Sequence, residues 1–308
     1  MRSFLIGGPR ENEVTPEALF YQRRRHLLAL GVGLGLGCVN NRQALAIPML
    51  NAAWKAGSEP PTALSDITGY NNYYEFSTDK KAVKILAQAL TQKPWTITVD
   101  GEVEKPYTVD ADDLIKLFGS EERIYRLRCV EGWAMVVPWS GFALSKLIAR
   151  AQPTSRAKFV AFESLKRSSE MIGQRSSHLP WPYREALRID EAMHPLALAV
   201  TGMYGLPLPK QNGAPLRLAL PWKYGFKSAK AIVRIQLLNA QPVTSWNQAS
   251  ASEYGFYGNV NPEVPHPRWS QSRENRIGEL QKRATLPYNG YAKWVADLYL
   301  GMDPKSAY

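Results

Sequence analysis

The chain has 308 residues, of which 45% are hydrophobic and 21% are charged, and its net charge is +11 at pH 7. This length and apolar content suffice for one large domain with a buried core. The basic residues are spread along the sequence and never form a run of five or more, which argues against nucleic-acid binding and fits a polyanionic ligand or an acidic partner surface equally well.

The N-terminal segment has the three parts of an export signal. Residues 21–46, YQRRRHLLALGVGLGLGCVNNRQALA, contain an arginine cluster, an apolar stretch and a small-x-small ending. The apolar stretch is shorter than the roughly 20 residues of a membrane-spanning helix, so a membrane anchor is the less favoured alternative. Arg23 and Arg24 are typical of twin-arginine signals, which direct folded proteins for export. We therefore expect residues 1–46 to be removed and residues 47–308 to form a single domain.

Short helices and strands alternate in the first half of that domain. Residues 47–77 have no apolar period and are expected to form an irregular arm over the core. Ser77-Thr78-Asp79 predicts the start of a helix that runs to Leu90, and residues 95–99 alternate as a strand before a turn at Asp100-Gly101. Further elements are predicted as helices at 111–118, capped by Asp110, and at 144–151, and as strands at 124–128 and 158–162.

The second half is rich in proline and glycine. Residues 176–230 are expected to be loops, interrupted only by a strand at 216–220. A further strand is predicted at 231–238, an aromatic and loop-rich stretch at 241–290, and a last helix at 291–300. The sequence shows no internal repeat and no linker between domains. It therefore predicts one α+β domain with mixed sheets and long functional loops.

Cys129 is the one cysteine of residues 47–308, so it cannot form an internal disulfide. It stands at the end of a predicted strand, and Arg126 and Arg128 are close enough in sequence to favour its thiolate. A buried, inert thiol is the ordinary alternative. A nucleophilic cysteine would need a histidine, and none lies nearby in sequence, whereas a thiolate bound to metal would not need one. The sequence has no C-x-x-C pair, H-E-x-x-H motif or haem-attachment motif.

Several stretches resemble the molybdopterin enzymes of the sulfite-oxidase fold family, and among them the periplasmic protein-methionine-sulfoxide reductases. The stretches are NNYYEF (71–76), RLRCVEGW (126–133), VPW (137–139), NGAPLR (212–217), PWKYGFKSAK (221–230), NP (261–262) and HPRW (266–269). The resemblance covers residues 47–308 and the signal. It implies a sulfite-oxidase-type molybdopterin-binding catalytic domain whose mixed sheets carry long loops around the cofactor.

The resemblance also implies the site residues. It makes Cys129 the protein's ligand to molybdenum and the catalytic residue. The implied cofactor contacts are Asn71, Tyr74, Glu75, Ser164, Asn212, Arg217, Ser228, Ala229 and Lys230, with Ser164 standing where the family often has threonine. Arginine and lysine suit the phosphate of the pterin, and backbone amides at 228–230 suit an anion nest. The ordinary alternatives are a plain turn at Asn212-Gly213 and a core position for Tyr74.

The implied activity is reduction of methionine sulfoxide residues in periplasmic proteins by one molybdenum-molybdopterin per chain. The chain has no motif for haem or an iron–sulfur cluster, so the resemblance implies electrons from a haem-containing integral membrane subunit. Two alternatives remain open. One is another reaction of the same cofactor, either S- or N-oxide reduction or sulfite oxidation; sulfite oxidases typically add a dimerisation domain, for which this sequence leaves little room. The other is a non-catalytic exported module.

Overall fold

The protein is described by a computed structural model that covers residues 49–50, 59–303 and 305. The predicted export signal at 1–46 and its cleavage point lie outside these residues. No helix in the described ranges is long and apolar enough to cross a membrane.

Strands form two sheets, and most helices are short. The strands are β1 (Met49–Leu50), β2 (Thr96–Gly101), β3 (Tyr107–Asp110), β4 (Glu121–Arg128), β5 (Trp133–Ala143), β6 (Phe159–Ser164), β7 (Arg184–Arg188), β8 (Leu198–Met203), β9 (Leu206–Pro207), β10 (Arg217–Ala219), β11 (Ile232–Leu238), β12 (Arg273–Arg276) and β13 (Lys282–Ala284). The α-helices are α2 (Leu64–Gly69), α3 (Val83–Leu86), α4 (Leu114–Phe118), α5 (Leu144–Arg150), α6 (Ile189–Met193), α7 (Ser245–Ser250) and α8 (Ala292–Val295). The 3-10 turns are η4 (Ala87–Ala89), η5 (Ala111–Asp113), η6 (Ile172–Arg175), η7 (Lys210–Asn212), η8 (Gly225–Lys227), η9 (Pro287–Gly290) and η10 (Ala296–Tyr299).

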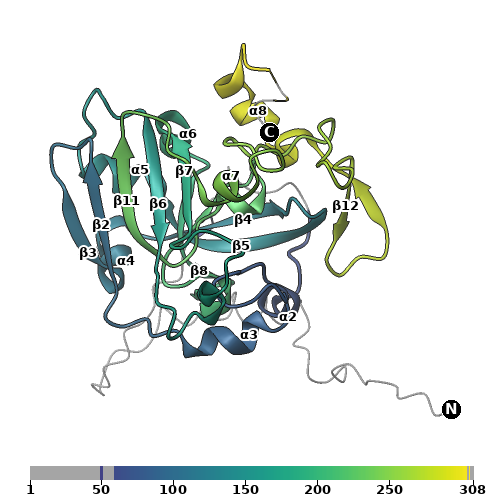
Figure 1. Ribbon diagram of the computed structural model, residues 1–308, viewed down its shortest axis with the longest axis horizontal. Coiled ribbons are helices and arrows are strands. Elements are labelled where there is room, and N and C mark those ends of the chain that lie inside the picture. The colour runs from purple at the N-terminus through teal and green to yellow at the C-terminus, as the bar shows by residue number, and fades with distance from the viewer. Residues whose placement is uncertain (1–48, 51–58, 304, 306–308) are drawn as a thin grey trace, which may run out of the picture. The chain divides into compact units, whose positions relative to one another are not determined.

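The larger sheet is built on the antiparallel hairpin of β4 and β5, which pair from Glu121↔Gly141 to Arg128↔Ala134. Its path runs β1-β4-β5-β12-β13, and β8 pairs with β5 and carries β9 and β10. In Figure 1, β4 and β5 cross the view toward β12 at the right. The loop that joins β4 to β5 begins at Cys129 and turns at Gly132, whose φ of 90° suits glycine. The hairpin therefore presents Cys129 at the end of the sheet.

The smaller sheet has the order β3-β2-β11-β6-β7 and stands at the left of Figure 1. Strand β11 runs parallel to β2 and antiparallel to β6. In β2, Ile97 and Val99 are buried while their neighbours are exposed or half-buried, so the predicted alternation is confirmed. The mixed sheets and scattered helices also confirm the predicted α+β class.

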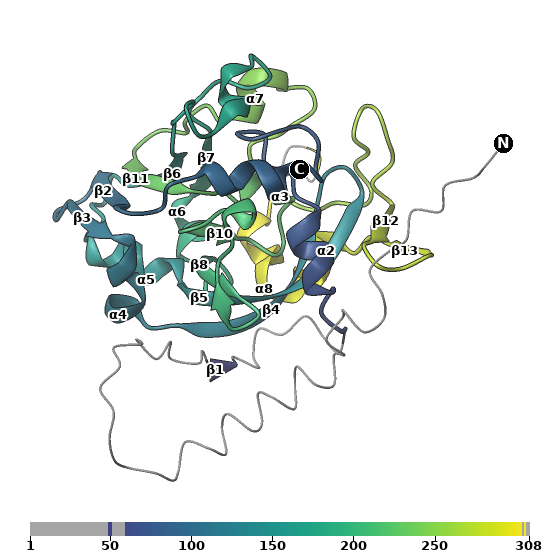
Figure 2. The same ribbon diagram turned by 90° about the horizontal axis from the view of Figure 1, so that it is seen from below.

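Helix α2, helix α3 and turn η7 pack against one another, although η7 is more than 120 residues further along the chain. Figure 2 shows α2 and α3 on the side of the molecule seen from below, next to β10. This packing brings the segment after α2, which contains Asn71, against Asn212 at the end of η7.

The helix predicted at 78–90 is shorter than expected. The Asp79 carboxylate accepts a hydrogen bond from the Lys81 amide over 2.8 Å, as a capping residue does. Residues 78–82 nevertheless form turns, α3 begins only at Val83, and the helix tightens into η4 after one turn. The arm predicted at 47–77 also contains a helix, α2, which the sequence analysis missed.

The stretch at 176–230 is rich in loops, as expected, but has more regular structure than the one predicted strand. This stretch contains β7, α6 and β8 besides β10. Strand β7 lies at a sheet edge and has the sequence REALR, in which three of five residues are charged. It therefore shows no apolar alternation from which a strand could be predicted. Strand β5 was missed because Pro138 interrupts it; within the sheet, Pro138 pairs with Ile124. Elements α7, β12 and β13 likewise lie in the stretch predicted as loop at 241–290.

Candidate active site

Cys129 lies at the start of the β4–β5 loop, where only 6% of it is exposed. Its amide donates to the carbonyl of Trp133, and its carbonyl accepts from the amide of Gly132, so the loop is a closed turn. The Sγ atom accepts two hydrogen bonds: from Nδ2 of Asn72 over 3.3 Å and from the amide of Glu131 over 3.4 Å. These two hydrogen bonds fix the orientation of the Cys129 side chain.

Glu131 is the centre of this small network. Its Oε2 accepts from Asn72 over 2.9 Å and from Trp133 Nε1 over 2.9 Å, and it lies 3.1 Å from Nζ of Lys80. Burial opposes ionisation of Glu131, but these hydrogen bonds and the charge of Lys80 outweigh it and lower the pKa of the carboxyl. The sequence analysis missed Asn72, Glu131 and Lys80 as site residues. Glu131 lies inside the quoted RLRCVEGW stretch, whereas nothing in the sequence signals Lys80.

The two arginines before Cys129 each pair with a carboxylate that is distant in sequence. Arg126 pairs with Glu59, with 2.6 Å between Nε and Oε2. Arg128 is fully buried and donates to Glu274 over 3.1 Å and to Gln271 Oε1 over 2.8 Å. Burial, reinforced by the charge of Glu131, raises the pKa of the Cys129 thiol to about 12, and Arg128 offsets only part of this rise. Arg128 therefore favours the thiolate, as predicted, but burial outweighs its effect in the protein without its cofactor.

Cys129 opens into a pocket that is lined by both polar and aromatic side chains. Seven of the predicted site residues line it: Asn71, Tyr74, Glu75, Cys129, Asn212, Arg217 and Lys230. They come from the segment after α2, the β4–β5 loop, η7, β10 and the turn before β11. Tertiary packing therefore brings together residues that are spread over 160 positions of the sequence.

Asn71 and Asn212 form one wall of the pocket. Nδ2 of Asn212 donates to Oδ1 of Asn71 over 2.9 Å and to the carbonyl of Ile67 over 3.0 Å. Oδ1 of Asn212 is buried and has no hydrogen-bond partner among the described residues. An unpaired buried acceptor is costly, so this atom is suited to a donor on a bound molecule.

Arg217 and Lys230 give the pocket an excess of positive charge. The guanidinium of Arg217 is buried, lies 4.8 Å from the ring centre of Trp139, and donates to the carbonyls of Leu218 and Asn212. Within the described ranges, neither Arg217 nor Lys230 has a carboxylate within ion-pair distance. Burial lowers the pKa of Arg217 to about 10 and that of Lys230 to about 8.

The buried carboxyl of Glu75 interacts electrostatically with Lys230, and burial raises the pKa of Glu75 to about 7. One partly protonated carboxyl cannot neutralise two cations. A bound anion would complete the charge balance of this wall, and the phosphate of a pterin cofactor fits that requirement. The donor set of the pocket, one thiol and two cations that Glu75 compensates only in part, therefore fits molybdopterin.

Three predicted cofactor contacts do not line the pocket. Ser164 is completely buried at the end of β6, and its Oγ has no partner among the described residues. The amides of Ser228 and Ala229 donate to the carbonyls of Gly225 and Lys227 inside their own turn, so the anion nest predicted at 228–230 is not open in this structure. The roles of these three residues stay predictions.

Aromatic side chains form much of the remaining lining, and the sequence analysis did not assign them to the site. They are Tyr70, Trp133, Trp139, Tyr183, Phe226, Trp246 and Tyr254. Trp246 and Tyr254 lie with their ring centres 4.4 Å apart, and Tyr74 meets Trp246 edge-on at 5.4 Å. Among the described residues, no three His, Cys, Asp or Glu side chains lie where together they could hold a metal ion.

The geometry and the family model together define the class of the protein. The model for the oxidoreductase molybdopterin binding domain matches residues 84–246, which include Cys129, Asn212 and Arg217. The chain is a molybdopterin-binding oxidoreductase with an α+β fold.

Known relatives define the family within that class. The chain is 50% identical to the catalytic subunit MsrP of protein-methionine-sulfoxide reductase from Burkholderia mallei, over 99% of this chain and 97% of that one. The corresponding subunits of Xanthomonas axonopodis pv. citri and Ralstonia nicotianae are each 51% identical, over 96% and 95% of this chain and 96% and 94% of theirs. Sulfane dehydrogenase SoxCD of Paracoccus pantotrophus gives a TM-score of 0.44 at 16% identity, over 82% of this chain and 63% of that one. The chain belongs to the family of protein-methionine-sulfoxide reductase catalytic subunits, and the alternative of a non-catalytic module is wrong.

Proposed function

We propose that this enzyme repairs oxidised methionine residues in periplasmic proteins, with electrons from a haem-containing integral membrane subunit. We further propose that Cys129 is the ligand that the protein provides to molybdenum. The observation that carries the proposal is that the Cys129 sulfur lines the same pocket as Arg217 and Lys230, two cations that have no carboxylate within ion-pair distance among the described residues.

The reaction consumes two electrons and two protons for each sulfoxide and yields a thioether and water. The cofactor, when bound, would supply the oxygen-atom acceptor and the electron store for this exchange. Arg217 and Lys230 would hold its phosphate, and Asn71 and Asn212 its polar edge. Asn72 and the Glu131 amide would fix the direction of the Cys129 sulfur, as partners behind a metal ligand do.

The aromatic lining would receive the oxidised side chain. Phe226, Trp133 and Trp246 are half-buried and line the pocket, so they offer apolar surface that water can still reach. A methionine sulfoxide has a polar sulfur and a terminal methyl group. Aromatic rings make favourable contacts with sulfur and with methyl groups, so this lining suits the substrate and displaces water from the sulfoxide.

Purified protein tests the proposal directly. The fully active enzyme should contain about one molybdenum and one pterin per chain and no haem, because Cys129 is the one thiol of residues 47–308. It should reduce an oxidised protein when supplied with a one-electron donor. Full activity with zinc, or without any metal, would refute the molybdenum site.

The proposed location has its own test. The signal-like residues 1–46 support export by the twin-arginine route, and replacement of Arg23 and Arg24 by lysine should retain the protein in the cytoplasm. Cell fractionation measures the outcome, with replacement of Arg2 and Arg10 as the matched control. Normal export of the Arg23/Arg24 variant would refute this route without affecting the activity.

A further inference from the structure

The turn at 221–230 forms the wall of the pocket next to Cys129. Gly225, Phe226 and Lys230 line the pocket. A Cβ atom built on Gly225 would lie 3.7 Å from the carbonyl oxygen of Arg128 and 4.0 Å from Cα of Cys129. Tyr224 also forms an isolated β-bridge with Arg128. The turn at 221–230 therefore lies directly against the backbone of Arg128 and Cys129, which positions the sulfur.

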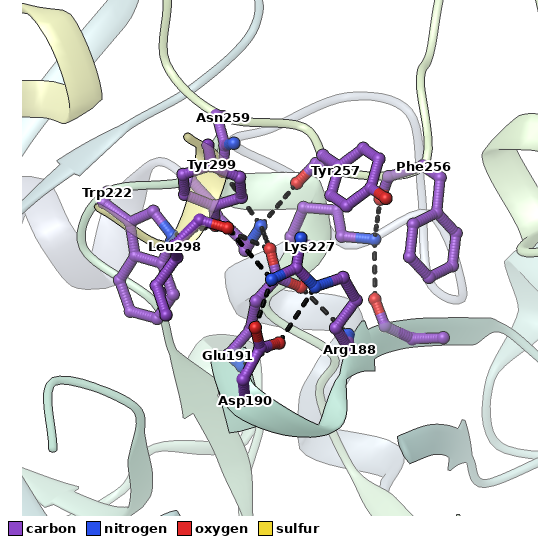
Figure 3. A network of polar contacts seen from close by, with 12 residues as sticks. Arg188, Asp190, Glu191, Trp222, Lys227, Phe256, Tyr257, Asn259, Leu298 and Tyr299 are labelled. Carbon is purple, nitrogen blue, oxygen red and sulfur yellow. Dashed lines mark hydrogen bonds and ion pairs between the residues drawn. The ribbon is translucent and has the colours of Figure 1, made fainter. Parts of the chain in front are cut away.

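Two lysines of the turn, Lys223 and Lys227, do not line the pocket, and their side chains are completely buried. Nζ of Lys227 lies 2.6 Å from Oε1 of Glu185 and donates to the carbonyls of Ala186 and Phe256 over 2.8 and 2.5 Å. The Lys227 and Glu185 side chains are both 0% exposed. Figure 3 shows Lys227 pointing toward Phe256. All three ammonium protons are thus used to join the turn to β7 and to the loop after α7.

Lys223 repeats this arrangement four residues earlier. Its Nζ lies 2.6 Å from Oε1 of Glu191 and donates to Oδ1 of Asn259 and the carbonyl of Tyr257 over 2.9 and 2.8 Å. The Tyr299 hydroxyl donates to the same Glu191 oxygen over 2.5 Å and accepts from Nε1 of Trp222 over 2.8 Å. Figure 3 shows Glu191, Trp222 and Tyr299 gathered around this point. The C-terminal turn η10 is therefore part of the same network.

Burying the Lys227–Glu185 and Lys223–Glu191 ion pairs costs free energy, so a gain in stability does not explain why the protein contains them. Removing four charged groups from water is unfavourable, and a well-packed apolar replacement of both partners is often no less stable. What such pairs provide is a fixed geometry, because each buried ammonium group must meet acceptors in three set directions.

We propose that Glu185 and Glu191 are positioning residues for the cofactor: through Lys227 and Lys223 they set the place of the turn at 221–230 against Cys129. The inference rests on the proposed function, in which the pocket holds molybdopterin. Neither carboxylate touches the pocket wall that carries Cys129. Their effect reaches the cofactor through Gly225, Phe226 and Lys230.

Glu185→Gln tests the proposal, because it removes the charge at constant size. We expect the variant to release the cofactor about tenfold faster than the wild type, the consequence of a displaced turn and a weakened set of charge-assisted contacts. The molybdenum EPR spectrum of the fraction that stays loaded should also change. The matched control is Glu163→Gln, which removes the partner of Arg184 from a surface pair of 2.7 Å on the neighbouring strand. Wild-type retention and an unchanged spectrum in Glu185→Gln would overturn the proposal.

A double variant separates positioning from stability. Glu185→Leu with Lys227→Met removes both charges and should recover the unfolding temperature lost in Glu185→Gln. It cannot remake the bonds to Ala186 and Phe256, so cofactor release should stay fast. Recovery of stability and retention together would show a merely structural pair and overturn the proposal.

Glu185→Asp provides a further test of the proposal if the other variants fail to fold. It keeps the charge but withdraws the carboxylate by one methylene group. Faster cofactor release from this variant supports the proposal, and wild-type release contradicts it. Absence of molybdenum from the wild-type protein itself would contradict the proposed function, whereas loss confined to the variants is specific to the positioning role.

Discussion

Asn72 and Cys129, 57 positions apart in the sequence, are joined by a hydrogen bond of 3.3 Å from Nδ2 to Sγ. The second amide hydrogen of Asn72 is directed to Glu131 over 2.9 Å, so one side chain holds both the sulfur and the carboxylate two residues later. The segment after α2 is thereby tied to the β4–β5 loop at the reacting end of the pocket.

Asn72→Ala should lower sulfoxide reduction by about tenfold or more, because a hydrogen bond to an ionised group contributes roughly 1.5–3 kcal/mol. The molybdenum content should fall little, since Asn72 would orient the sulfur and not bind the pterin phosphate. Turnover per molybdenum and the EPR spectrum measure the two effects. Asn275→Ala, at an exposed position of β12, is the control. An unchanged spectrum with full turnover would show that Asn72 has no influence on the sulfur.

Cys129→Ser should give a soluble protein with little or no reductase activity per folded molecule. Serine is harder than a thiolate and its hydroxyl resists deprotonation, so it is a poor ligand for molybdenum. A buried cysteine without a ligand role would behave in the opposite way, losing about 1 kcal/mol of stability while activity survived. Activity per molybdenum-loaded protein distinguishes the two, and wild-type turnover would refute the ligand role.

Arg217→Met should reduce cofactor retention by roughly ten- to a hundredfold, because it removes one charge-assisted contact to phosphate of about 1.5–3 kcal/mol. The free energy of unfolding of the cofactor-free protein should change little, since a buried guanidinium without a carboxylate partner is itself unfavourable. Pterin content and denaturant unfolding measure the two quantities. The same change at Arg234, which pairs with Asp100 and is 40% exposed, is the control. Full pterin content in Arg217→Met would make the phosphate assignment wrong.

Gly173→Ala should displace the segment that carries Tyr74 and Glu75. A Cβ at position 173 would lie 2.1 Å from the carbonyl oxygen of Tyr74 and 2.8 Å from the carbonyl carbon of Glu75, and backbone cannot move aside as a side chain can. We expect a loss of about 1–3 kcal/mol in the free energy of unfolding and reduced pterin content. Gly69→Ala, where an added Cβ meets nothing within 4 Å, is the matched control. Equal stability and pterin content in both variants would contradict the prediction.

Lys230 should give the cofactor-free protein a distinct pH dependence. Burial, with repulsion from Arg217, lowers its pKa from 10.5 to about 8. The folded protein then binds fewer protons at Lys230 than the unfolded chain does, so the unfavourable contribution is complete below about pH 8 and disappears as the pH rises to 10.5. This group therefore makes the free energy of unfolding increase with pH across that window.

Lys230→Met should remove that increase, and denaturant unfolding between pH 8 and 10 measures it against the wild type. Comparing the two proteins cancels the contributions of other groups that titrate in the same range. Lys84→Met, at an exposed position of α3, should leave the pH dependence as it is in the wild type. A wild-type slope in Lys230→Met would show that Lys230 is not held at a lowered pKa.

The amino-acid sequence alone determined the local features. The alternation at 95–99 predicts a strand because it is a half-buried run whose pattern depends only on near neighbours. The position of Cys129 at the end of a strand could be predicted in the same way. Through the resemblance of their stretches to a known family, Asn71, Asn212 and Arg217 could also be predicted as site residues. Strands β5 and β7 could not be predicted, because Pro138 interrupts the first, REALR shows no apolar alternation, and the cross-strand partners that stabilise them are distant in sequence.

Only the tertiary structure decided how charge is arranged around the site. From sequence, Arg128 was expected to favour the thiolate of its neighbour Cys129, but its ion pair with Glu274, 146 positions away, and the burial that outweighs its charge follow only from the fold. Lys223 and Lys227 stand in the same turn as Lys230, but the first two are directed to Glu191 and Glu185 and only the third reaches the pocket. A charged side chain that is removed from water must find a partner, and which partner lies within reach depends on long-range packing that residue spacing does not encode.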